Sequence, residues 1–209
     1  MQNSTSTHII DTLPALEALF GSVSEAAIRK EVPFLHPVYQ AFIKASPFVI
    51  LASSGPRGLD VSPRGDPPGF VVVQDEHTLL LPERRGNNRI DTLRNLLVNP
   101  QVALLFLIPG IGEGLRVNGR VRITTAPELM QKLAMKDALP QCVLEITVET
   151  ALFQCARAIA RSQLWQGVSE EVRLSVPSAG TMLTALSLGS VDGEKYDREL
   201  PERLRTTLY

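Results

Sequence analysis

The sequence predicts a β-rich α+β protein whose antiparallel strands curl into a barrel. Short apolar runs separated by turn residues follow one another without intervening helices over residues 47–82. The segment 115–123, LRVNGRVRI, alternates apolar and polar residues without a break, as an antiparallel strand with one buried face does. Because strands come in runs instead of alternating with helices, a doubly wound sheet is excluded, and a sheet of this size tends to close and remove its edges.

Seven apolar runs are strand candidates, and we expect about six strands in the barrel. The candidates are 47–53, 58–63, 69–74, 77–82, 101–109, 115–123 and 142–150.

Helices are expected before, within and after this strand-rich region. At the front, amphipathic patterns predict helices over Thr12–Gly21, Ser24–Val32 and His36–Ala45, with Asp11 and Ser24 as N-caps. Further helices are predicted over 126–136, 151–164 and 177–186, together with one inside residues 83–100.

The helix inside residues 83–100 should begin with a capping box, in which Asn88 pairs with Asp91 three residues later. These patterns divide the chain into three parts. Residues 1–46 form a helical segment that packs on the barrel, 47–165 form the barrel, and 166–209 form a C-terminal extension with a charged surface tail.

Composition argues against several classes of function. The 209 residues carry a formal net charge of −1, so the chain has no global basic field for nucleic acid or an anionic membrane. Its two cysteines and three widely separated histidines show no metal-ligand spacing. No apolar run is long enough to cross a membrane, and no export signal is recognisable, so we expect a cytoplasmic protein.

The most informative segment is ERRGNNR (83–89), which lies between a strand and a helix. Free N–H groups and the positive end of the helix dipole gather at such a junction. Arg84, Arg85 and Arg89 add guanidinium groups, and Gly86 lets the backbone come close to a ligand. The segment therefore predicts a phosphate site; the alternative is a solvated cationic loop.

Four segments resemble a subgroup of the pyridoxamine 5'-phosphate oxidase-like FMN-binding proteins. They are VSPRGDPPGFV (61–71), LLLPERRGNNRIDTLRNLLVNPQVALLFLIPG (79–110), LRVNGRVRI (115–123) and CARAIARSQLW (155–165). The resemblance implies a six-stranded antiparallel Greek-key split β-barrel with flanking helices. It also implies a homodimer that holds FMN in clefts at its interface.

The same resemblance suggests roles for individual residues. Ser62 and Arg64 should lie near the flavin ring or ribityl chain, and Leu81 and Pro82 should offer backbone contacts. The residues expected to hold the phosphate are Arg84, Arg85, Asn88 and Arg89.

Arg157, Arg161 and Trp165 recur at i, i+4 and i+8 of the predicted last helix. They could form a cation–aromatic edge to the flavin cleft, supplied by the partner protomer, or simply a packed helix face.

The function expected from these observations is that of an FMN-dependent oxidoreductase acting on a small molecule. Two alternatives stay open: a non-catalytic flavin binder or carrier, and a reductase that uses the deazaflavin F420. Oxidation of vitamin B6 itself is not expected, because the chain lacks a match to the C-terminal substrate-binding segment of the true pyridoxamine phosphate oxidases.

Overall fold

The computed structural model describes residues 8–209, which belong to two units, 1–31 and 32–209. The first unit contains two short helices, α1 (Leu13–Glu17) and α2 (Glu25–Arg29). Ser24 caps α2 as predicted, but the side chain that caps α1 is that of Thr12 and not that of Asp11. Both helices end earlier than their apolar patterns suggested.

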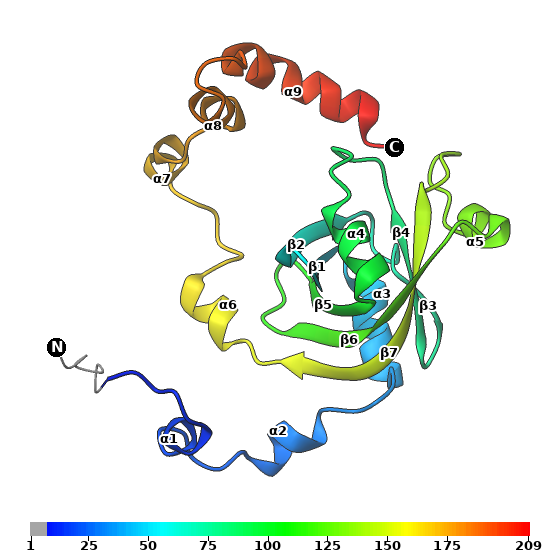
Figure 1. The fold of residues 1–209 in the computed structure, drawn as a ribbon, viewed down its shortest axis with the longest axis vertical. Coiled ribbons are helices and arrows are strands. Elements are labelled where there is room, and N and C mark those ends of the chain that lie inside the picture. The colour runs from blue at the N-terminus through cyan, green and yellow to red at the C-terminus, as the bar shows by residue number, and fades with distance from the viewer. Residues whose placement is uncertain (1–7) are drawn as a thin grey trace. The chain divides into compact units, whose positions relative to one another are not determined.

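The second unit is built on one antiparallel sheet of seven strands, in the order β2-β1-β5-β6-β7-β4-β3 (Figure 1). All seven candidate runs form strands, so the expected count of six was wrong. In the described chain β2 and β3 are the two edges of the sheet, and no hydrogen-bonded ladder joins them. The strands are β1 (Phe48–Gly55), β2 (Gly58–Gly65), β3 (Val72–Asp75), β4 (Thr78–Glu83), β5 (Gln101–Leu107), β6 (Gly114–Thr124) and β7 (Cys142–Gln154).

Helices lie before, within and after the sheet in sequence. They are α3 (Pro37–Ala45), α4 (Asp91–Val98), α5 (Pro127–Lys132), α6 (Arg157–Ser162), α7 (Glu170–Ser175), α8 (Ala179–Leu186) and α9 (Gly193–Thr207). The prediction of α8 is confirmed, whereas the tail that we expected only to be charged and exposed is the long helix α9. No helix in residues 8–209 is both long enough and apolar enough to span a bilayer.

The helix predicted over 151–164 was wrong in its first part. Strand β7 continues through Gln154, and Ala151 and Leu152 pair with Val117 and Arg116 of β6. Both residues are buried in the sheet, and the Ala151 backbone also exchanges hydrogen bonds with Val32. Burial and strand pairing therefore override the helical periodicity of this segment.

The predicted capping box at the start of α4 was also wrong. The N-cap position is Ile90, which has left-handed backbone (φ 52°) and makes no side-chain capping bond. Asn88 is left-handed as well (φ 59°) and lies in the preceding loop. The arginine loop, defined here as residues 84–90, is consequently free of regular structure, and α4 begins with uncapped N–H groups.

The hydrophobic core fills the concave side of the curved sheet. Phe106, Leu115 and Ile146 are fully buried there, and α3 and α4 add Ile43 and Leu96. Packing of both helices against the sheet fixes where the loops before and after them lie, and one of these is the arginine loop.

A bulge in β6 leaves no room for a side chain at one position. The register between β6 and β7 shifts at Asn118 and Gly119, and a Cβ at Gly119 would lie 2.2 Å from the Thr147 carbonyl oxygen. Gly119→Ala should therefore lower the free energy of unfolding by about 1–3 kcal/mol in urea titrations. Gly167→Ala is the control, because nothing lies within 4 Å of its Cβ position, and it should change stability by less than about 0.5 kcal/mol. Equal effects would show that the bulge tolerates a side chain.

Candidate functional site

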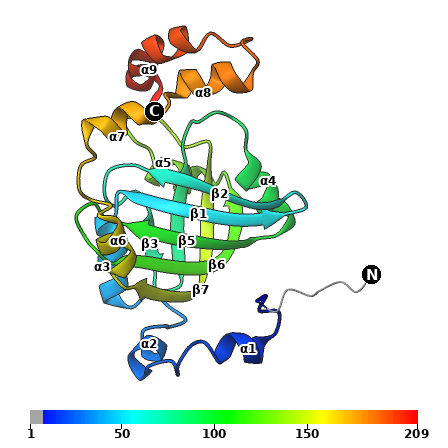
Figure 2. The same ribbon diagram turned by 90° about the vertical axis from the view of Figure 1, so that its left-hand side faces the viewer.

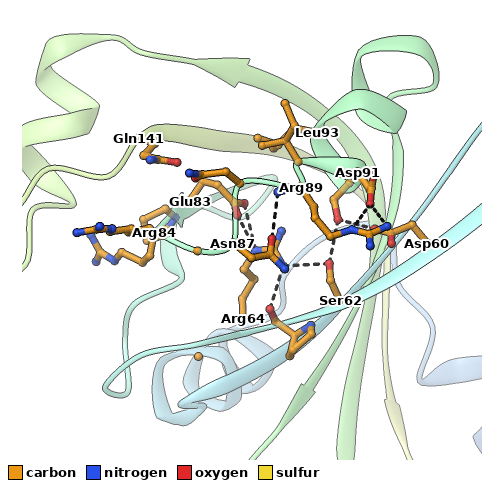
Figure 3. A pocket seen from close by; sticks show the side chains of 18 of the residues that line it. Asp60, Ser62, Arg64, Glu83, Arg84, Asn87, Arg89, Asp91, Leu93 and Gln141 are labelled. Carbon is orange, nitrogen blue, oxygen red and sulfur yellow. Dashed lines mark hydrogen bonds and ion pairs between the residues drawn. The ribbon is translucent and has the colours of Figure 1, made fainter. Parts of the chain in front are cut away.

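The candidate site is a cavity of about 480 Å³ between β2, the end of β4, the arginine loop and the start of α4 (Figure 3). Its size is typical of pockets for small molecules and cofactors. Most residues of its wall are polar or charged, and the apolar members include Phe70, Pro82, Ile90 and Leu93.

The edge strand β2 forms one wall of the cavity with every second side chain. Asp60, Ser62 and Arg64 point to the cavity side, because every second residue of a strand faces the same way. Ser62 Oγ lies 2.9 Å from Thr92 Oγ1, and the Thr92 hydroxyl donates to the Asp60 carboxylate. These side-chain bonds fasten β2 to the first turn of α4.

An ion pair between Arg64 and Glu83 crosses the cavity wall. Arg64 Nε lies 3.0 Å from a Glu83 carboxylate oxygen, and Arg64 Nη1 donates to Ser62 Oγ over 3.0 Å. The two charged side chains are only 16% and 14% exposed. Burial raises the pKa of Glu83, and the neighbouring Arg64 offsets part of that increase. Glu83 is thus a largely shielded carboxyl whose pKa lies above its ordinary value.

Sequence reasoning did not select Glu83 as a site residue. The signal that was available is its place at the end of the apolar run LLLP, where a carboxylate follows a buried strand directly.

Arg84 lines the cavity and also anchors the arginine loop. Its Nε donates to Asp66 over 2.9 Å, and its Nη1 donates to the Leu133 carbonyl over 2.8 Å. The Asp66 side chain is 1% exposed, so this ion pair is well shielded from water. Arg84 was expected to bind a phosphate, but its guanidinium group already donates hydrogen bonds to Asp66 and to the Leu133 carbonyl.

The other two arginines of the loop are exposed. Arg89 pairs with Asp91 over 2.9 Å, whereas Arg85 forms no hydrogen bond or ion pair with any residue in the described range 8–209. Hydrogen bonds from Arg89 and Arg57 lower the pKa of Asp91, which keeps this carboxylate ionised at neutral pH. Exposed pairs of this kind contribute little, so Arg89 can leave Asp91 at small cost.

The backbone of the arginine loop is accessible. Nothing lies within 4 Å of the Cβ position of Gly86, and α4 begins without a side-chain cap beside it. Asn88, which the resemblance suggested as a phosphate-binding residue, lines the cavity next to these groups. An anion at this end could meet main-chain N–H groups, the helix dipole and a guanidinium.

Three predicted site residues lie elsewhere in this chain. The Leu81 side chain is fully buried in the core, so any contact with a ligand would come from its backbone. Helix α6 ends at Ser162, and Trp165 therefore does not share a helix face with Arg161, contrary to the expected spacing. Trp165 Nε1 donates to the Ile111 carbonyl over 2.6 Å. Neither Arg161 nor Trp165 lines the cavity.

Residues 8–209 contain no group of three or more His, Cys, Asp or Glu side chains arranged to hold a metal ion. His36 accepts a hydrogen bond from the Val38 backbone at the start of α3, and His77 lies 3.4 Å from Glu76. Cys142 is buried and Cys155 is exposed.

The buried Glu83 carboxyl predicts a pH dependence. A folded-state pKa above the ordinary value of 4.5 means that the folded protein binds this proton more tightly than the unfolded chain. The resulting stabilisation is complete below pH 4.5 and is lost as pH rises through the folded-state pKa. The unfolding free energy of the wild type should therefore fall, relative to that of Glu83→Gln, as pH rises from 4.5 towards neutrality.

Urea unfolding at a series of pH values measures this difference. Gln141→Ala changes an uncharged residue of the same wall and should give a curve parallel to the wild type. A Glu83→Gln curve that is also parallel would contradict the assignment.

Comparison with known proteins gives one family and several distant structures. Residues 35–155 match the family model described as pyridoxamine 5'-phosphate oxidase. No curated protein sequence matches the chain.

Solved structures with a similar fold include a single-substitution variant of HupZ from Group A Streptococcus, with 18% identity and a TM-score of 0.47 over 57% of this chain and 99% of that one. A candidate pyridoxamine 5'-phosphate oxidase from Lactobacillus delbrueckii shows 20% identity and a TM-score of 0.46 over 58% and 95% of the two chains. General stress protein 26 of Bacillus anthracis shows 15% identity and a TM-score of 0.40 over 54% and 88%.

Proposed function

Because the matching model covers more than half of its length, the chain belongs to the pyridoxamine 5'-phosphate oxidase family, and we propose on this premise that it binds FMN in the cavity and serves as an oxidoreductase for a small molecule. Members of this family commonly bind flavin. The proposal places the FMN phosphate at the arginine loop and the rest of the cofactor along β2.

The arginine loop is the observation that carries the proposal. Arg85 has no ion-pair partner in residues 8–209, and the accessible backbone around Gly86 lies beside the uncapped start of α4. A phosphoryl group would be stabilised there by charge-assisted hydrogen bonds and by the helix dipole. Arg89 and Asn88 are close enough in the chain to join, whereas Arg84 would hold the loop from behind.

The remaining wall suits the rest of FMN. The hydroxyls of Ser62 and Thr92 could bind the ribityl chain, and Leu81 and Pro82 could offer backbone contacts to the ring. FMN when bound supplies the redox chemistry by accepting a hydride. The Arg64 guanidinium, oriented by Ser62 and Glu83, would stabilise negative charge on a reduced flavin. Glu83, with its raised pKa, is the group that could take up or release a proton at its carboxyl oxygen.

Arg85→Ala tests the phosphate end. Loss of one charge-assisted hydrogen bond should weaken FMN binding by about tenfold or more, because such bonds contribute about 1.5–3 kcal/mol. Riboflavin lacks the phosphate, so its affinity should not change, and fluorescence titration with both flavins measures the contrast. Arg122→Ala is the control, since Arg122 pairs with Glu145 on β6 and β7, outside the cavity wall.

Equal losses for FMN and riboflavin would contradict the phosphate assignment. Wild-type protein that ignores both flavins would contradict the proposed function. Bleaching of the bound flavin by NADH or NADPH without oxygen would support an oxidoreductase, and FMN that stays oxidised would instead indicate a carrier.

We further propose that the protein acts as a homodimer, with the outer face of β2, β1 and β5 at the interface. Figure 2 shows these strands side by side with β6 and β7. Register places Val61, Ala52 and Ala103 on this outer face, and Leu59 and Val61 are 87% and 65% exposed. An apolar face of this kind is typical of a self-complementary interface. Ser62 and Arg64 of the same edge strand line the cavity, so a partner protomer would lie next to the flavin.

Val61→Asp tests the interface by placing a charge at its centre. Light scattering should show a dimer for the wild type and a shift towards monomer for the variant, because an unpaired carboxylate is costly to bury. Leu97→Asp, at a residue of α4 that is 76% exposed and on a different element, should leave the mass unchanged. A monomeric wild type at micromolar concentration would refute the dimer.

A further inference from the structure

The last residue of the chain lies against the anchor of the arginine loop. The Tyr209 hydroxyl donates to one oxygen of Asp66 over 2.6 Å, and the other oxygen accepts from Arg84 Nε over 2.9 Å. Asp66 is 1% exposed, so its carboxylate is shared between two donors with little access for water. Residues 143 positions apart in sequence thus meet at one buried group.

The segment after α5 completes this arrangement. Arg84 Nη1 donates to the Leu133 carbonyl over 2.8 Å, and Lys136 Nζ lies 5.0 Å from the centre of the Tyr209 ring. A cation over an aromatic face is attracted to the ring electrons. Tyr209 is therefore held at both its hydroxyl and its ring. We call Asp66, Arg84, Lys136 and Tyr209 the C-terminal clasp.

The rest of the extension does not hold this position by burial. Residues 161–178 are all exposed, and the polypeptide passes through α7, α8 and α9 before Tyr209 meets the Asp66 carboxylate. The hydrogen bond to Asp66 raises the pKa of Tyr209, so the phenol stays protonated and can donate throughout the neutral range. Tyr209 is thus held by a defined hydrogen bond from its phenol to the Asp66 carboxylate.

We propose that Tyr209 and Asp66 are positioning residues, which hold Arg84 and thereby fix the arginine loop in the shape that receives a phosphoryl group. This inference rests on the proposed FMN function. The arginine loop has no regular structure, so its ordering would otherwise oppose ligand binding. With Arg84 fixed, the neighbouring Arg85 and Gly86 are pre-organised before the ligand arrives.

Two variants of the full chain separate the two contacts of Tyr209. Tyr209→Phe keeps the ring beside Lys136 and removes the hydroxyl, whereas deletion of Tyr209 removes both. Tyr196→Phe is the matched control, because Tyr196 lies in α9 and its ring packs under Arg203 at 4.1 Å. Thermal melting of each variant checks that global folding is preserved.

The first measurement is limited trypsin cleavage without flavin, followed by mass spectrometry. Arg84 is a potential cleavage site that is 17% exposed and bonded at two nitrogens. Tyr209→Phe should speed cleavage after Arg84 by about three- to tenfold, the range expected for one lost hydrogen bond. Deletion of Tyr209 should speed it further, and Tyr196→Phe should match the wild type. Unchanged cleavage in both Tyr209 variants would overturn the clasp.

The second measurement is the rate at which FMN and riboflavin dissociate. Tyr209→Phe should release FMN about three- to tenfold faster and leave riboflavin unchanged, because the clasp acts on the phosphate end. A merely structural role would affect both flavins alike. Faster cleavage with unchanged FMN release, or tighter FMN binding, would overturn the positioning role. Should the wild type bind no FMN, the proposed function fails, while the cleavage result still decides whether Tyr209 holds the loop.

Discussion

The open seam between β2 and the β4-β3 edge is the constraint on which the site depends. The sheet curls without a ladder between its two edges in the described chain, so only side chains bridge the seam at the cavity. The Arg64–Glu83 pair bridges the seam, and the contact between Ser62 and Thr92 ties β2 to α4 beside it. A buried ion pair is costly to desolvate and adds little net stability. Its place in the cavity wall is therefore better explained by ligand binding than by folding.

The arginines around the cavity differ in how firmly they are held. Arg84 pairs with the Asp66 carboxylate, whose side chain is 1% exposed, and removal of Arg84 would leave this buried charge without an ion-pair partner. Arg89 is 75% exposed in its pair with Asp91, so a phosphoryl group could replace that carboxylate at small cost. Firm and exchangeable contacts thus occur within six residues of one loop. This arrangement keeps the loop in place while its exposed guanidinium groups remain available.

Local patterns predicted the strands and the cavity-forming segment, but not the partners of the side chains. The alternation in LRVNGRVRI identified β6, whereas β7 ran past its predicted end because Ala151 and Leu152 gain sheet pairing that no local pattern reveals. The family resemblance named Ser62, Arg64 and residues of the arginine loop as site residues, and in the structure they line one cavity. The contacts of Glu83 and Asp66 were not predicted, because their partners are distant in sequence. Glu83 meets Arg64 across 19 positions, and Asp66 meets Arg84 across 18 positions and Tyr209 across 143.

A seam bridged by side chains should respond to whatever binds along it. Each bridging contact is individually weak, so a ligand that touches both β2 and the arginine loop would stabilise the folded protein by linkage. A partner protomer on the outer face of β2 would hold the same strand from the other side. The C-terminal clasp holds the loop that faces it. The cofactor, the partner protomer and Tyr209 would then all act on β2 or the arginine loop. Loss of any one of these contacts should therefore weaken the other two.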